Sequence, residues 1–232
     1  GYTFAGVWQE DDVNAPFVDA NGQTNGKTNG EVYKVKPGNS KYVDVNKDGV
    51  YNDADQGIIG CGQPTFNWGW NNTFNYKNFD FSFFVVGFHG FDIYNATHQM
   101  GYNLIKSQQM AGVTPMRELL NRWTPTNTNT DIPGFVKGGT ENKDFFSTRF
   151  VENGSFIKMK SITLGYTLPE ATCRSLGINN LRVYASVQNP FHITKYSGLD
   201  PEATMGSPLV QGVDWGAYPN SRNYLIGLNF SF

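Results

Sequence analysis

The chain is dominated by short segments in which apolar, often aromatic, residues alternate with small or polar ones. In residues 65–76 (TFNWGWNNTFNY), for example, aromatic side chains fall on one face of an extended chain and asparagines on the other. A period of two indicates β-strands with two unlike faces. Within residues 155–168 the alternation shifts near Lys158–Lys160, which suggests a β-bulge. The pattern predicts about six strands, at residues 2–9, 65–76, 78–90, 155–168, 181–189 and 222–232.

Long and short connections alternate between these predicted strands. Strands of roughly 9–12 residues can cross a bilayer when tilted, and membrane barrels join them by short periplasmic turns and long extracellular loops. We therefore predict an all-β chain that forms an antiparallel transmembrane β-barrel segment. A helix is expected only at 113–123, with Thr114 as N-cap and Pro115 as the first helical residue. The predicted extracellular loops are about 10–64, 91–154 and 190–221, and the predicted periplasmic turns are about 77–78 and 169–180.

Composition and length exclude several other classes of protein. Only 16% of the residues are charged, and 18 Lys and Arg against 20 Asp and Glu form no basic patch, so no nucleic acid is expected as a partner. No apolar stretch approaches the roughly 18 residues of a membrane helix. Six strands cannot close a barrel, because the smallest membrane barrels have about eight. The chain opens with Gly-Tyr-Thr-Phe and has no signal peptide, so we expect a portion of a larger protein.

Several motifs in a fixed order resemble one family. They are PGNSKYVDVNKDGVYNDADQGIIG (37–60), YKNFDFSFFVVGFHGFDIYN (76–95), NRWTPTNTNTDIP (121–133), FIKMKSITLGYTLP (156–169) and LRVYASVQNPFHITKYSGLDPE (181–202). With them the chain resembles the C-terminal part of a SusC/RagA-type TonB-dependent outer-membrane transporter. The final Gly227-x-x-Phe230-x-Phe232 also resembles the signature by which outer-membrane barrels are recognised for assembly, although Leu225 stands where a polar residue is usual.

The resemblance implies a location, an architecture and partners. The location is the cell outer membrane of a Gram-negative bacterium. The fold is a barrel of about 22 strands around an N-terminal plug, and this chain would supply about six C-terminal strands. The resemblance also implies import of an oligosaccharide or peptide cargo, a SusD-like surface lipoprotein as partner, and energy from TonB through the N-terminal part. The plug and the TonB box are not in this chain, so it would contribute barrel wall against outer-membrane lipid and outer loops.

One loop motif points to calcium. Residues 44–55 fit the pattern D-x-[DN]-x-[DN]-G-x5-acid of calcium-binding loops, with Asp in place of the usual final Glu. Gly49 permits the sharp turn that brings alternate oxygen atoms together. The same composition also suits an Asx-rich surface turn, because Asn, Asp and Gly favour turns. We predict a structural calcium site whose ligands are Asp44, Asn46, Asp48, the carbonyl of Val50, and Asp55.

The aromatic residues offer two kinds of contact. Trp68 and Trp70 have the flat faces that stack on sugars, but they share a strand face with other aromatic residues, which is typical of an interfacial belt against lipid. Aromatic residues of the predicted loops are freer to touch cargo or the lipoprotein. These are Trp123, Tyr196 and Trp215.

Neither catalysis nor a disulfide is expected. His89, His98 and His192 stand apart, and the usual hydrolase and zinc motifs do not occur, so we predict that the chain is not an enzyme. Cys61 follows a predicted outer loop and Cys173 lies in a predicted periplasmic turn, which a membrane of roughly 25–30 Å would separate. A disulfide needs Cα atoms within about 7 Å, so we predict two free thiols.

Two alternatives remain open at this stage. A soluble, secreted β-sandwich stabilised by calcium and binding glycans would show the same alternation, and it would stay dissolved without detergent. A small complete barrel acting as an adhesin or enzyme would need at least two more strands than the sequence offers.

The lipid-facing assignment makes the first testable prediction. If Leu228 faces lipid and Asn229 faces the lumen, Leu228→Arg should cost roughly 2–4 kcal/mol at mid-membrane and block assembly, whereas Asn229→Arg should be tolerated. The amount of each variant recovered in the outer membrane measures this difference. Equal tolerance at both positions would contradict the assignment.

Overall fold

The computed structural model describes residues 1–102, 116–134, 146–205 and 211–232. The chain forms two compact units, each built from segments that are distant in sequence. The first holds Gly1–Gly60 and Tyr94–Val151, and the second holds Cys61–Ile93 and Glu152–Phe232. Two short strands, β7 (Asp92–Asn95) and β8 (Val151–Asn153), contain points at which the chain passes from one unit to the other.

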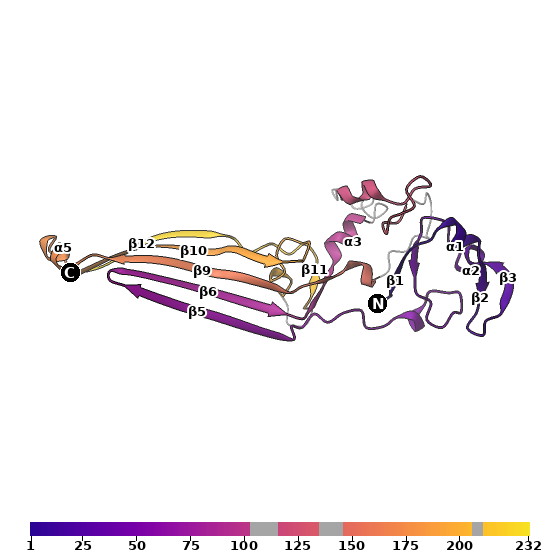
Figure 1. The fold of residues 1–232 in the computed structure, drawn as a ribbon, viewed down its shortest axis with the longest axis horizontal. Coiled ribbons are helices and arrows are strands. Elements are labelled where there is room, and N and C mark those ends of the chain that lie inside the picture. The colour runs from indigo at the N-terminus through magenta and orange to yellow at the C-terminus, as the bar shows by residue number, and fades with distance from the viewer. Residues whose placement is uncertain (103–115, 135–145, 206–210) are drawn as a thin grey trace. The chain divides into compact units, whose positions relative to one another are not determined.

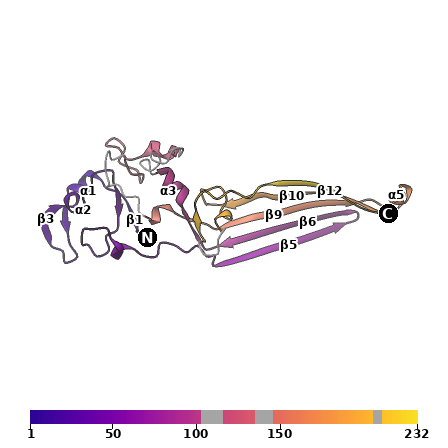
Figure 2. The same cartoon turned by 180° about the vertical axis from the view of Figure 1, so that it is seen from behind.

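The second unit is built on one antiparallel sheet of five long strands (Figure 1). Their order is β12-β10-β9-β6-β5, and every neighbouring pair is antiparallel. Figure 2 shows the same strands side by side from behind. Five of the predicted strands are thereby confirmed. They are β5 (Phe66–Tyr76), β6 (Phe79–His89), β9 (Phe156–Thr167), β10 (Asn180–Thr194) and β12 (Asn223–Ser231).

The two short connections are tight, as the sequence predicts. Tyr76 pairs with Phe79, so only Lys77 and Asn78 join β5 to β6, and Lys77 has a φ of 52°. The other connection holds a short helix, α5 (Glu170–Ser175).

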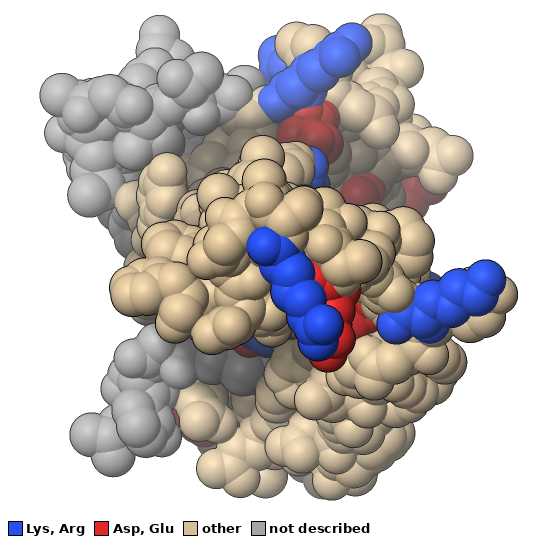
Figure 3. All heavy atoms as spheres, turned by 90° about the vertical axis from the view of Figure 1, so that its left-hand side faces the viewer, with Lys and Arg blue, Asp and Glu red and all other residues tan. Residues whose placement is uncertain are grey.

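Viewed from the end of the sheet where α5 lies, a few Lys and Arg side chains lie beside acidic ones on a surface made mostly of other residues (Figure 3).

The register gives the sheet one apolar and one polar face. Residues directly opposite each other in antiparallel strands point to the same side. One row crosses all five strands, from Phe74 through Phe81, Leu164 and Ala185 to Ile226. Polar residues of the same strands, among them Asn229, lie together on the opposite face. They are Asn71, Asn75, Thr163, Thr167, Asn229 and Ser231.

A bulge keeps the apolar face continuous. Phe84 pairs with Ser161 and Val85 pairs with Met159, so Lys160 is an extra residue in β9, as predicted from the shifted pattern. The extra residue changes which residues face which side. The apolar face therefore uses odd-numbered residues such as Met159 before the bulge and even-numbered residues such as Ile162 after it.

On the polar face, side chains cross the sheet over glycines. The Arg182 guanidinium on β10 reaches across β9 to Asp80 on β6, with hydrogen bonds of 2.9 and 2.5 Å. Gly165 lies beneath this pair, and a Cβ there would stand 2.3 Å from Asp80 Oδ1. Arg182 also lies 5.0 Å from the ring centre of Tyr184, and the Tyr184 ring covers Gly227 on β12. This series of contacts, here called the transverse strap, links four strands.

The core of the second unit lies at the end of the sheet opposite to α5. Phe91, Ile93, Phe156 and Tyr196 are almost fully buried together, and Phe88 packs against them. Short elements complete this end, where β7 pairs with β8 and β11. They are the 3-10 helix η4 (Ala203–Met205) and β11 (Val213–Asp214).

In the first unit, the prediction that residues 10–64 are only a loop is wrong. Aromatic rings form a core there: Tyr33 stacks on Tyr51 at 5.2 Å and lies 5.5 Å from Trp8. Burial of these rings supports short elements where polar composition alone suggested irregular chain. They are β1 (Phe4–Val7), α1 (Glu10–Asn14), β2 (Pro16–Val18), β3 (Thr24–Thr28), α2 (Asn29–Tyr33), β4 (Ser40–Tyr42) and the 3-10 helix η1 (Asp53–Asp55).

The prediction of six strands in one sheet is also wrong. The strand expected at 2–9 is only β1, which pairs with β4 inside the first unit. Its register shifts between Phe4 and Gly6, where Gly6 has a φ of 107°, and α1 begins at Glu10, so the segment is too short and irregular to join the long strands.

The described residues contain helical turns both within the predicted helix and in segments predicted to be loops. Within the predicted helix 113–123, Arg117–Asn121 form the 3-10 helix η2, while Thr114 and Pro115 lie outside the described residues. The segment 91–154 also contains α3 (Ala96–Tyr102) and the 3-10 helix η3 (Thr148–Phe150). The predicted loop 190–221 starts too early, because β10 continues to Thr194.

The transverse strap yields a second prediction. Gly165→Ala would place a methyl group where Asp80 and Arg182 meet, so the two side chains must separate and their charge-assisted hydrogen bonds are lost. We expect the free energy of unfolding to fall by about 1–2 kcal/mol, measured by urea titration of the folded receptor that contains this chain. Gly57→Ala is the control, because a Cβ at Gly57 meets no atom within 4 Å. Equal stability of Gly165→Ala and the control would contradict the role of Gly165.

Candidate functional site

The predicted calcium loop is a network of Asx turns. Asp44 Oδ2 accepts the backbone N–H of Gly49 at 2.8 Å, and Asp48 Oδ1 accepts that of Val50 at 2.8 Å. Asn46 Oδ1 accepts the N–H of Asp48 at 3.1 Å. Gly49 has a φ of 82°, the left-handed conformation that the sharp turn requires.

The donor atoms of this loop fit a cation in part. Asp44 Oδ1 is buried and has no hydrogen-bond partner. Both oxygens of Asp55, in contrast, hold backbone N–H groups of the loop, those of Val45 at 2.8 Å and Asn52 at 3.0 Å. In the described part of the chain, no group of three or more His, Cys, Asp or Glu side chains is arranged for a metal. A cation here would depend on amide and carbonyl oxygens as well as carboxylates.

Burial and hydrogen bonds shift the pKa values of groups in and beside the loop. Burial, followed by a 2.8 Å hydrogen bond that the Tyr33 hydroxyl donates to Asp44, raises the pKa of Tyr33. Burial raises the pKa of Tyr51 to about 12. Hydrogen bonds from the Asn46 side chain and the Val50 backbone lower the pKa of Asp48. Asp48 therefore stays ionised at neutral pH, as cation binding requires.

A buried ion cluster lies in the second unit, and sequence reasoning did not find it. Lys158 on β9 is 3% exposed at its side chain and donates to Asp200 at 2.8 Å and to Glu202 at 2.7 Å. Lys160 also pairs with Glu202. Asn220 donates to Asp200 from its backbone at 3.1 Å and from its side chain at 3.2 Å. The only sequence signal was a lysine pair at the predicted bulge, facing an acidic Asp-Pro-Glu segment.

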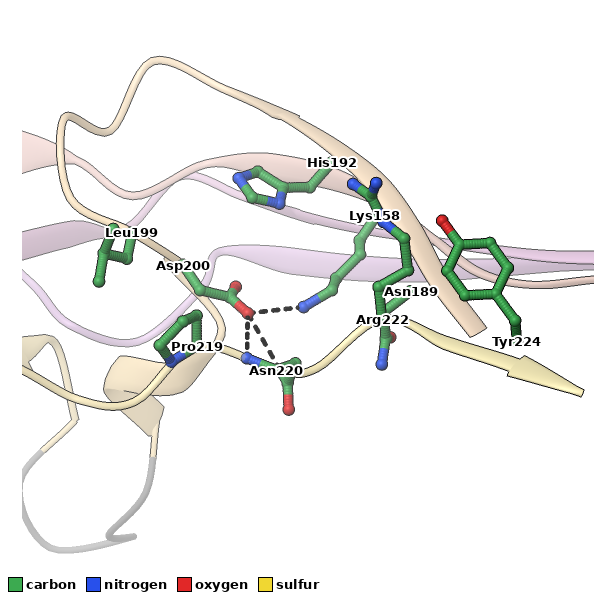
Figure 4. A pocket seen from close by; sticks show the side chains of 9 residues that line it. All are labelled: Lys158, Asn189, His192, Leu199, Asp200, Pro219, Asn220, Arg222 and Tyr224. Atoms are coloured by element: carbon green, nitrogen blue, oxygen red, sulfur yellow. Dashed lines mark hydrogen bonds and ion pairs between the residues drawn. The ribbon is translucent and has the colours of Figure 1, made fainter. Parts of the chain in front are cut away.

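This cluster forms one side of a pocket of about 370 Å³ (Figure 4). The pocket lies where β12 has not yet begun to pair with β10, since Asn223 is paired with Gln188 and β10 continues to Thr194. Its lining residues are Lys158, Asn189, His192, Leu199, Asp200, Pro219, Asn220, Arg222 and Tyr224.

The aromatic residues considered for contact with cargo or lipid lie in different environments. Trp68 and Trp70 lie on the apolar face, where Trp68 donates to His89 at 3.1 Å and Trp70 packs edge-on against Phe83. Tyr196 is buried and donates to Asp214 at 2.5 Å, so it is not available for cargo.

The two other aromatic residues of the predicted loops differ in exposure. Trp123 packs over Gly38 and donates to Gln9 at 2.9 Å, whereas Trp215 is 68% exposed.

Cys61 is exposed, Cys173 is buried, and both are free thiols as predicted.

The ion cluster makes a third prediction. Burial alone would raise the pKa of Asp200 and Glu202, but hydrogen bonds and charge from Lys158, with Lys160 at Glu202, lower both pKa values. Because the unfolded state then binds more protons, the stabilisation is complete above the ordinary carboxyl pKa of about 4 and is lost as the pH falls through the lowered values.

Lys158→Met should weaken this dependence and destabilise the fold by about 3–5 kcal/mol, since the buried Asp200 carboxylate loses its cationic partner while Glu202 keeps only Lys160. Hydrogen exchange of residues 195–205 and 211–222, followed from pH 7 to pH 3, measures both effects. Arg174→Met is the control, because Arg174 pairs only with Glu170 and both side chains are more than 80% exposed. Unchanged protection in Lys158→Met would contradict the role of the cluster.

None of the helices in the described residues has the length and apolarity that crossing a membrane demands.

Known proteins resemble the chain over most or all of its length. It is 34% identical over 238 residues to TonB-dependent receptor P3 of Formosa agariphila. It is 32% identical over 199 residues, 85% of the chain, to TonB-dependent receptor SusC of Bacteroides thetaiotaomicron. It spans only 22% and 18% of the length of these relatives. No family model matches the chain.

A solved structure shares the fold. The structure of the RagAB peptide transporter matches all of this chain with a TM-score of 0.71 and 24% identity, and the match covers 22% of that chain. The relatives bear the names of receptors and transporters, which fits a chain that is not an enzyme. This chain is therefore a segment of a SusC/RagA-type TonB-dependent receptor of the Gram-negative outer membrane.

Proposed function

We propose that the chain forms barrel wall and extracellular loops of a transporter that imports oligosaccharides or peptides together with a SusD-like lipoprotein, using energy delivered by TonB. The observation that carries this proposal is the apolar face of the five-stranded sheet. Trp70, Phe74 and Phe230 on that face are each more than half exposed. In water such a surface would drive aggregation, whereas a lipid bilayer is its natural solvent.

The soluble sandwich is the weaker candidate. A sandwich covers the apolar face of each sheet with a second sheet packed about 10 Å away. In the described residues the long strands form a single sheet, and β5 and β12 stand at its edges. Unpaired edges of this length invite pairing with further strands, which the remainder of a larger barrel would supply.

The proposal is tested on the native protein. Outer membranes are extracted with detergent, and the species that contains these peptides is isolated for intact mass and partner identification. We expect a polypeptide several times heavier than the 25.9 kDa of this chain, together with a surface lipoprotein. A species of 25.9 kDa that stays soluble without detergent would contradict the proposal and favour the sandwich.

We further propose that the loop at residues 44–55 binds calcium in a structural role, with Asp44, Asn46, Asp48, the Val50 carbonyl and Asp55 as ligands. The supporting observation is the buried Asp44 Oδ1, which has no hydrogen-bond partner. A cation would satisfy that oxygen and hold the turn beside the aromatic core of the first unit.

Terbium, a luminescent calcium substitute, tests this site in the detergent-solubilised receptor. Tyr33, which contacts Asp44, serves as the energy donor for terbium emission. Asp44→Asn should weaken terbium binding by about tenfold or more, since carboxylate number sets affinity. Asp53→Asn removes the same charge from an exposed side chain of the same loop that the motif does not use, and it should leave binding unchanged. Equal loss in both variants, or no loss in Asp44→Asn, would overturn the site.

A further inference from the structure

The pocket beside the Lys158 cluster has a floor whose charges are already neutralised. Two carboxylates, Asp200 and Glu202, face two ammonium groups, Lys158 and Lys160. Asp200 Oδ2 accepts from Lys158 and from Asn220, and its Oδ1 accepts the backbone N–H of Glu202. These acidic oxygens are engaged by donors of the protein itself, so they oppose a bound anion less than their formal charge suggests.

The wall of the pocket, in contrast, presents unused donors. Neither the Arg222 nor the His192 side chain makes a hydrogen bond or ion pair with any residue in the described ranges, and both residues are exposed. Figure 4 shows both among the side chains around the pocket, Arg222 from the segment before β12 and His192 from near the C-terminal end of β10. The unsatisfied charge of this pocket is therefore positive.

The remaining lining suits an organic anion better than a bare inorganic one. Leu199, which is 70% exposed, and Pro219 offer apolar surface. The Tyr224 side chain lies at another side of the pocket and adds a hydroxyl group and a ring. A volume of about 370 Å³ exceeds what a single small ion fills and admits a sugar ring or an amino-acid residue.

We propose that this pocket binds a carboxylate group of an acidic cargo, with Arg222 as the main anion partner and His192 as a second donor. A planar guanidinium matches a carboxylate through two parallel hydrogen bonds. The inference rests on the proposed transport function for the origin of the ligand, but the binding itself can be measured without transport. A uronic acid unit of an oligosaccharide and the C-terminus of a peptide share this chemistry.

The experiment uses the complete receptor in detergent and fluorine NMR. Trifluoroacetate is the carboxylate probe, and trifluoroethanol is a neutral probe of similar size. We expect broadening of the trifluoroacetate signal only, and we expect Arg222→Gln to weaken this binding by about tenfold. His192→Gln should weaken it less. Arg174→Gln removes the same charge from the exposed helix α5, away from the pocket, and should leave binding unchanged.

Competition then distinguishes the two sources of the carboxylate. A galacturonate trisaccharide and a tripeptide with a free C-terminus are added separately, with the amidated tripeptide as control. Displacement of trifluoroacetate by either acid supports the proposal and identifies the source. Equal broadening in wild type and Arg222→Gln, or displacement by neither acid, overturns it. Because no step measures uptake, a receptor that failed to transport could still pass this test, and one that transports could fail it.

Discussion

The requirement that every strand present one apolar and one polar face governs the second unit. In an antiparallel sheet the side chains alternate strictly, so one extra residue sends all later side chains to the other face. The bulge at Lys160 uses this rule: it places Met159 and Ile157 with Ile162 and Leu164 on the apolar face. The pair Asn189–Pro190 opposite keeps the parity of β10, so that Phe191 and Ile193 continue that face.

The polar face depends on small residues beneath large ones. Gly165 lets Asp80 and Arg182 meet across β9, and Gly227 accepts the Tyr184 ring. The glycine of the C-terminal sequence signature thus has a packing reason inside this fold. The two faces of β12 therefore differ. Its apolar side chains belong to the apolar face of the sheet, and on its polar face Gly227 makes the last contact of the transverse strap.

The carboxylates of the two units have different hydrogen-bond and ion-pair partners. In the loop at residues 44–55, carboxylates are held by backbone N–H groups and one carboxylate oxygen remains without a partner. In the Lys158 cluster, acids and ammonium groups satisfy one another, and the Arg222 guanidinium lies on the pocket wall without an ion-pair partner among the described residues. This difference is the reason for proposing a cation at the first site and an anion at the second.

The sequence by itself determined the five long strands, their faces, the bulge and the tight hairpin at Lys77–Asn78, because period-two alternation and turn chemistry are local properties. It also determined the resemblance to one receptor type, which the comparisons confirm. Only the tertiary structure decided that β1 leaves the main sheet, that residues 10–64 fold around aromatic rings, and that Lys158 meets Asp200. These outcomes depend on contacts between residues far apart in the chain, such as the 42 positions that separate Lys158 from Asp200, and local pattern carries no information about which distant partners meet.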